Sequence, residues 1–213
     1  MLFDFLKKNF ELVLFSAAIV ALAAFLRFSG AADVQPLEFF SALVSVAARP
    51  LLKRESPAGI VLSIIANIAF LFYFAGMGLL GLVALNVVFL TLNSIALYFW
   101  LVPDPKTKRI IRPTFINPLW WPGIIILAGA VVAVGAVMNG LVGALDYFAF
   151  AGGAVGLFLL TRKKIDCWAA LMATSMTNAA LFWLTGSYVM LAATFIFAYN
   201  DITAFMLWRR EAK

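Results

Sequence analysis

Long apolar stretches alternate with short polar segments along almost the whole chain. Eight of them predict α-helices, at about 10–29, 37–52, 58–75, 79–101, 119–138, 141–161, 167–184 and 187–208. About 20 apolar residues in a helix are enough to cross the hydrocarbon core of a bilayer. The pattern therefore predicts an all-α integral membrane protein with eight transmembrane helices.

The composition agrees with this interpretation. Of the 213 residues, 65% are apolar and 12% are charged, and the mean hydropathy is +1.03. Soluble domains are about 45–50% apolar and about 25% charged, so a soluble globular domain is excluded. The chain has no histidine, and Cys167 is its single cysteine. No internal disulfide can form, and the commonest metal ligand and general base is missing.

Enzyme signatures are absent from the sequence. It contains no phosphate-binding loop and no recurring pair of acids, and a Ser-His or Cys-His pair cannot exist without histidine. We therefore predict that the protein is not an enzyme and has no catalytic residues, metal ligands or cofactor.

Basic residues are confined almost entirely to alternate loops. Fifteen of the 16 lie at the two ends of the chain or between helices 2 and 3, 4 and 5, or 6 and 7, Arg49 among them; Arg27 is the exception. Because cytoplasmic loops carry the Lys and Arg excess, both termini are predicted to be cytoplasmic in a cell (inner) membrane. The net charge of +6 is then a topology signal, and no nucleic-acid partner is expected. The length of the first apolar run favours a retained anchor helix over a cleaved signal peptide.

Two parts of the chain resemble each other. The segment 66–72 is similar to 177–183 at an offset of 111, and 95–100 is similar to 203–208 at an offset of 108. This divides the chain into an extra N-terminal helix (1–32), a first three-helix repeat (33–101), a basic loop with a linker helix (102–140) and a second repeat (141–213). Because a single helix separates the copies, the repeats are predicted to be parallel, as in transporters that bind substrate at the repeat interface.

Polar side chains recur at matching places in the two repeats. Asn86 and Asn93 lie seven residues apart, and Thr194 and Asp201 repeat this spacing at an offset of 108. A substrate site is predicted from Asn67, Asn86, Asn93, Tyr98, Trp168, Ser175, Asn178, Phe182, Thr194 and Asp201, with Ser63 and Thr174 one turn from the two middle-helix amides. Amides and hydroxyls would bind the polar atoms of a small solute, and Trp168, Tyr98 or Phe182 would stack on its ring. The alternative is that these polar groups only join helices to each other.

Asp201 is the one acid predicted well inside a span. No basic residue within the spans is an evident partner for it. This favours a cationic ligand or a protonated carboxyl. An intramembrane enzyme with Asp201 as its catalytic group would need a second acid or a metal site, which the sequence does not supply.

Several segments resemble the PnuC family of vitamin transporters. They are 158–168, Gly186-Ser187-Tyr188, Trp208-Arg209-Arg210 and Leu145-Asp146 in the second half, and Gly59-Ile60 with 93–100 in the first. The resemblance implies a SWEET-like fold, three helices plus one plus three with an extra N-terminal helix. It also implies facilitated diffusion of nicotinamide riboside, a homotrimer and a cytoplasmic kinase that traps the substrate. Thiamine, riboflavin and deoxynucleosides are the alternatives, and a membrane scaffold or accessory subunit is the alternative of another class.

The chain departs from the family pattern at five positions. Leu171 stands at the second position of a Trp-x-x-Trp motif, and Ser175, Asn93 and Thr194 replace other polar or aromatic residues. Asp201 replaces a residue that is usually small or apolar. A lost stacking ring and a gained acid would suit another cationic ring, such as thiamine.

Overall fold

The computed structural model describes residues 10–30, 34–101 and 114–212. This part of the chain forms seven α-helices and one short 3₁₀ helix, and no β-strand. The elements are α2 (Phe10–Ser29), α3 (Pro36–Lys53), α4 (Pro57–Gly76), α5 (Leu80–Leu101), η1 (Pro118–Trp120), α6 (Trp121–Thr161), α7 (Cys167–Thr185) and α8 (Tyr188–Glu211). Six helical segments of this part, all but α3, are long and apolar enough to cross a membrane. The predicted helix ends agree with these bounds to within three residues.

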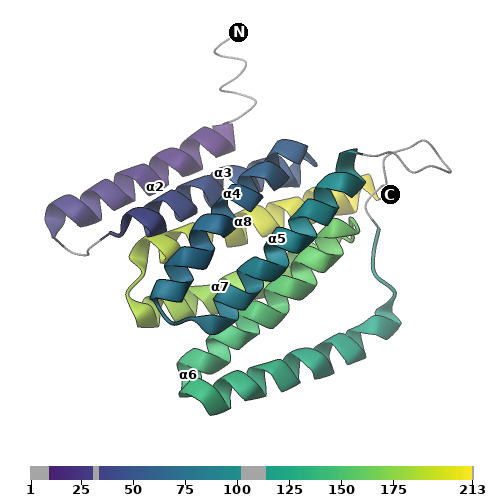
Figure 1. Ribbon diagram of the computed structural model, residues 1–213. Coiled ribbons are helices and arrows are strands. Elements are labelled where there is room, and N and C mark those ends of the chain that lie inside the picture. The colour runs from purple at the N-terminus through teal and green to yellow at the C-terminus, as the bar shows by residue number, and fades with distance from the viewer. Residues whose placement is uncertain (1–9, 31–33, 102–113, 213) are drawn as a thin grey trace, which may run out of the picture.

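The helix count differs from the predicted eight because α6 runs through both predicted segments, 119–138 and 141–161. Asn139 and Gly140 inside it depart from helical geometry, and Gly140 has φ 56° and ψ −136°. Here the chain folds back, so that α6 consists of two arms that meet at this turn (Figure 1). A Cβ atom added to Gly143 would lie 2.1 Å from the carbonyl oxygen of Gly135, so the arms approach closely because both residues are glycines.

Six helices form a closed ring. Each of α3, α4, α5, α6, α7 and α8 packs against the next along the chain, and α8 returns to pack against α3. Only the second arm of α6 belongs to the ring, where Gly153 contacts α5 and Gly156 contacts α7. The first arm lies outside it (Figure 1). Helix α2 packs across α3 and α8 and so covers the contact that closes the ring.

Two acids cap helices on opposite sides of the ring. Asp146, in the second arm of α6, accepts hydrogen bonds from the backbone N–H groups of Gly81 (2.7 Å) and Leu82 (2.8 Å) at the start of α5. Glu38, in α3, accepts one from the N–H of Met190 (3.3 Å) at the start of α8. A carboxylate stabilises a helix N-terminus by accepting its free N–H groups and by complementing its dipole. Glu38 and Asp146, and likewise Leu82 and Met190, are 108 positions apart.

A basic end of the bundle lies opposite these caps. We use this name for the end that carries Lys53, Arg54, Arg162, Lys163, Lys164, Arg209 and Arg210. The residues after α3 and α6, Glu55 and Lys163, both adopt positive φ (56° and 50°), and their side chains form an ion pair with each other. They too are 108 positions apart. The basic residues of 102–113 and of both chain ends (Lys7, Lys8 and Lys213) lie outside the described residues.

Candidate functional site

The ring encloses a cavity of about 110 Å³ to which all six of its helices contribute side chains. Its walls are mostly apolar, with polar groups on four of the six helices, α3, α4, α5 and α7. The polar lining residues are Ser45, Arg49, Ser63, Asn67, Asn86, Asn93, Thr174, Ser175 and Asn178. An apolar pocket with a few convergent polar groups is the usual form of a small-molecule site, and the polar groups fix the orientation of the ligand.

Two amides in the cavity wall lack partners. The Nδ2 of Asn67 on α4 and the Oδ1 of Asn178 on α7 are buried, and no hydrogen-bond partner for either lies in the described part of the chain. A buried polar group without a partner costs free energy comparable to a lost hydrogen bond. Two residues of the cavity wall, 111 positions apart, thus carry one donor and one acceptor without a partner.

Most other polar groups of the cavity bond to their own helices. The hydroxyl groups of Ser63 and Thr174 donate to the carbonyl oxygens four residues earlier, at 2.8 and 3.0 Å. The Nδ2 of Asn86 donates to the carbonyl oxygen of Leu82 at 2.7 Å. In a membrane such bonds satisfy a polar side chain without a second helix. A hydroxyl or amide bonded in this way still has an oxygen that can accept a further hydrogen bond.

Stacked phenyl rings form one wall. The ring centroids of Phe70 and Phe74 lie 5.3 Å apart, and those of Phe74 and Phe182 lie 6.0 Å apart with an interplanar angle of 6°. All three line the cavity. Such faces attract both flat rings and cations, because the π-system is negative on its face.

An ion pair closes the side of the cavity formed by α3 and α8. The guanidinium NH1 of Arg49 donates to the Oδ1 of Asp201 at 2.8 Å, and the Ser175 hydroxyl donates to its Oδ2 at 3.3 Å. Arg49 also lies over the Phe197 ring, 4.6 Å from its centroid. Asp201 is fully buried behind Arg49, which itself lines the cavity.

This pair corrects two sequence-based interpretations. Arg49 was counted with a loop, but it lies inside α3, four residues before the end of the helix. The prediction that Asp201 has no basic partner in the spans was wrong for the same reason. The carboxylate is already neutralised by the protein, so it gives no ground to expect a cationic ligand.

Six of the ten predicted site residues line the cavity: Asn67, Asn86, Asn93, Ser175, Asn178 and Phe182. The other four do not. Asp201 lies behind Arg49, and the Thr194 hydroxyl donates a hydrogen bond to the Met190 carbonyl oxygen of its own helix at 2.8 Å.

The two other aromatic candidates lie away from the cavity. Trp168 is 1% exposed and packs edge-on against Trp208, with 5.2 Å between ring centroids, in a core at the basic end. Tyr98 is 62% exposed on the outside of the bundle. Whether the six residues bind a substrate stays a prediction.

The cavity also contains residues that the sequence analysis did not select. They are Ser45, Arg49 and the phenylalanines Phe70, Phe74, Phe89 and Phe197, besides aliphatic side chains. A signal for two of them was present, because Asn67, Phe70 and Phe74 are spaced by three and four residues and share one helix face. Phenylalanine is so frequent in this chain, with 21 copies, that this signal did not stand out.

A family model for nicotinamide mononucleotide transporters matches residues 35–210. The chain belongs to this family. A solved structure described as the crystal structure of the vitamin B3 transporter PnuC is similar to the whole fold, with a TM-score of 0.74. The match covers 97% of this chain and 92% of that one at 12% sequence identity. No curated protein matches the sequence.

Membership in the family establishes two points. Its members are membrane transporters and not enzymes, as predicted from the absence of catalytic motifs. The apolar helices together with the family make this chain a multi-pass membrane protein. The resemblance to PnuC that the loops and helix ends indicated is confirmed.

Proposed function

We propose that the protein imports a vitamin or vitamin precursor by facilitated diffusion, and that nicotinamide riboside is its substrate. The observation that carries this proposal is the pair of unpartnered amide atoms in the cavity, the Nδ2 of Asn67 and the Oδ1 of Asn178. A primary carboxamide has one carbonyl acceptor and an NH₂ donor, which match these two atoms. Nicotinamide carries such a group on a flat ring, and the Phe70–Phe74–Phe182 wall offers that ring an aromatic face.

The pyridinium charge of nicotinamide riboside fits a cavity without net charge. Among the described lining residues the one cation, Arg49, is paired with Asp201. The positive ring would be held by phenyl faces, which attract cations by about 0.5–2 kcal/mol. Thiamine, riboflavin and deoxynucleosides remain alternatives, but the argument for thiamine from an unpaired Asp201 is removed.

The repeat architecture belongs to the same proposal. We propose that 33–101 and 141–213 are parallel three-helix repeats of a SWEET-like fold, that 1–32 and 102–140 are the extra and linker segments, and that the chain crosses the membrane eight times. The Glu38 and Asp146 caps support this, because equivalent acids bind equivalent helix starts in the opposite repeat. Both termini are then cytoplasmic in the inner membrane, and we further propose a homotrimer that supplies a cytoplasmic kinase with substrate.

Binding and uptake of nicotinamide riboside test the proposal. Asn67→Leu and Asn178→Leu should each weaken binding by about 1–3 kcal/mol, which is about five- to 150-fold, since a carboxamide atom then stays unpaired. The matched control is Asn200→Leu, because Asn200 is also buried and unpartnered but does not line the cavity. Nicotinic acid riboside, which lacks the amide NH₂, should bind wild type more weakly and should be insensitive to Asn178→Leu.

The competing function is a scaffold whose polar residues only join helices. Saturable uptake of the labelled riboside into proteoliposomes contradicts it. If the purified protein binds none of nicotinamide riboside, thiamine, riboflavin and deoxynucleosides in a thermal-shift panel, the proposed function is wrong. If it binds another of the four, only the choice of substrate is wrong.

A further inference from the structure

The two arms of α6 enclose a second hollow, outside the ring. They diverge from the turn as a V that opens toward the basic end (Figure 1). Between the arms lies a groove of about 770 Å³, bounded also by the end of α5 and by the segment before η1. Because the first arm lies outside the ring, this groove faces the surroundings of the bundle and is separate from the central cavity.

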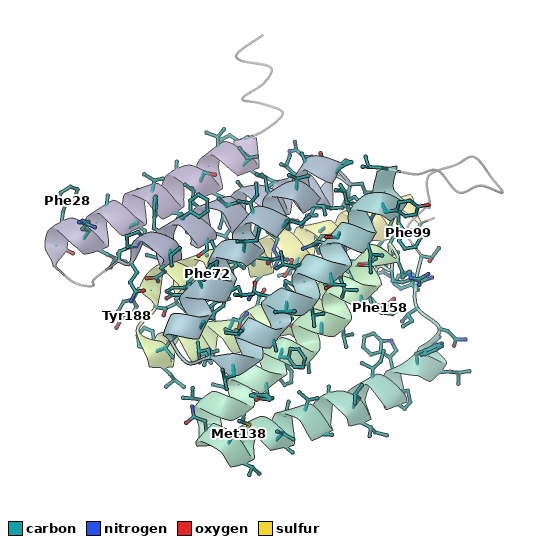
Figure 2. All side chains as sticks on the ribbon, viewed as in Figure 1. Phe28, Phe72, Phe99, Met138, Phe158 and Tyr188 are labelled. Atoms are coloured by element: carbon teal, nitrogen blue, oxygen red, sulfur yellow. The ribbon has the colours of Figure 1, made fainter. Side chains whose placement is uncertain are left out.

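Most of the groove has an apolar wall. Phe99 from α5, Ile124 from the first arm, and Ala154, Val155 and Phe158 from the second arm line it. Figure 2 labels Phe99 and Phe158 on this side of the molecule. Ala154 and Arg162 are eight residues apart, so the wall extends about 12 Å along the helix from the first cation. In a multi-pass membrane protein, a surface of this kind meets acyl chains.

The groove becomes cationic where it reaches the basic end. Arg162 and Lys164 line it there, beside Trp120 and Asn117, and no acid is among its described lining residues. Arg162 is exposed, with its guanidinium 5.4 Å from the centroid of the Phe99 ring. Lys164 Nζ donates to the Thr114 hydroxyl at 2.7 Å and keeps two further donors. Neither positive charge therefore has a counter-ion among the described residues that line the groove.

We propose that this groove binds an acidic glycerophospholipid. The phosphate would be held by Arg162 and Lys164, and the acyl chains would lie on the apolar wall. Guanidinium matches phosphate geometry, and basic pockets between membrane helices suit acidic headgroups. A zwitterionic lipid carries an ammonium group that the two cations repel, so the preference is for a headgroup such as glycerol. Trp120, which also lines the groove, is a residue type that is common at the boundary between headgroups and hydrocarbon.

Lipid binding to the purified full-length protein tests this proposal. In native mass spectrometry, phosphatidylglycerol should stay bound in preference to phosphatidylcholine, and it should raise the melting temperature. The variant R162Q/K164Q should lose about thirtyfold in affinity for phosphatidylglycerol, from about 1 kcal/mol for each cation. The matched control is R209Q/R210Q, which removes two exposed charges from the same end outside the groove and should keep the preference.

Three results would overturn the proposal. One is equal retention of the two lipids by wild type. Another is an equal loss of phosphatidylglycerol in both double variants, which would show attraction to the basic end as a whole. The last is a smaller particle mass for R162Q/K164Q by light scattering, which would make the groove an interface with a second copy of the chain. None of these results bears on the riboside, because the groove and the central cavity share no lining residue.

Discussion

Arg49 and Asp201 join the two ends of the helix ring through an ion pair of 2.8 Å. Arg49 belongs to its first helix, α3, and Asp201 to its last, α8. The positions 108 residues away, Leu157 and Asn93, lie on α6 and α5, which form the opposite side of the ring, and both line the cavity. The pair Arg49 and Asp201 is thus charged, whereas the equivalent positions on the opposite side of the ring carry neutral residues.

The neutral residues at the equivalent positions suggest which residues could replace the ion pair. Arg49→Leu alone should destabilise the protein by about 3–5 kcal/mol, because Asp201 is left buried without its cation. The double variant R49L/D201N copies the residue types Leu157 and Asn93 and should recover most of this loss. Thermal unfolding in detergent measures both. A double variant no more stable than R49L would show that the two pairs of positions are not interchangeable.

The same variants decide which group a cationic substrate meets. Asp201→Asn leaves the Arg49 charge uncompensated in the cavity wall, so a cationic ligand should bind about tenfold more weakly or worse, by simple repulsion. In R49L/D201N both charges are gone, and binding should return close to wild type. If the double variant binds as weakly as D201N, Asp201 itself holds the cation. Titration of nicotinamide riboside against each purified variant gives the comparison.

The caps at the start of α5 and α8 should contribute unequally to stability. Asp146→Ala removes two short hydrogen bonds to N–H groups and should cost about 1–3 kcal/mol. Glu38→Ala removes one longer bond and should cost less. Unfolding midpoints of the two variants check the order. A larger effect at Glu38 would mean that burial of the acids, and not their bonds to the helix starts, decides their role.

Where the two arms of α6 approach each other, there should be no room for a side chain in place of Gly143. Gly143→Ala places a methyl group against the Gly135 carbonyl and should destabilise the protein by at least the ~1–3 kcal/mol typical of overpacking. Gly129→Ala in the first arm is the control, because nothing lies within 4 Å of its added Cβ. Melting temperatures separate the two. Equal melting temperatures of the Gly143→Ala and Gly129→Ala variants would contradict the close packing of the two arms.

Helix positions could be predicted because their signal is local. Apolar length and the prolines at the starts of α3 and α4 mark the helices without knowledge of their neighbours. The amides at Asn67, Asn86, Asn93 and Asn178 could be selected because a repeat places equivalent residues around one centre. The boundary predicted between the segments 119–138 and 141–161 lies at the turn inside α6. The sequence did not predict that one helix assignment runs through both segments.

The errors concern how far along the bundle a side chain lies and which way it points. A sequence pattern does not contain this information. Tyr98 follows Asn93 by five residues, which is about 140° around the helix at 100° per residue, so the two cannot share a face. Trp168 shares the face of Ser175, but it lies two turns nearer the basic end, where Trp208 covers it. Arg49 was taken for a loop residue because a lone charge near a predicted helix end looks like a boundary. Its partner became visible only when α3 and α8 were brought together.

The packing of α2 has a mechanical consequence for the ring. Short loops join most consecutive ring helices, and α5 is joined to the second arm of α6 through the first arm, whereas α3 and α8 are the two ends of the ring and no segment links them directly. Helix α2 lies across it, and the Lys53 ammonium of α3 donates both to Glu11 of α2 (2.6 and 2.8 Å) and to Thr203 of α8 (3.3 Å). The family match starts after α2, at residue 35. Helix α2, which precedes the residues that the family model matches, thus holds together the two ends of the ring.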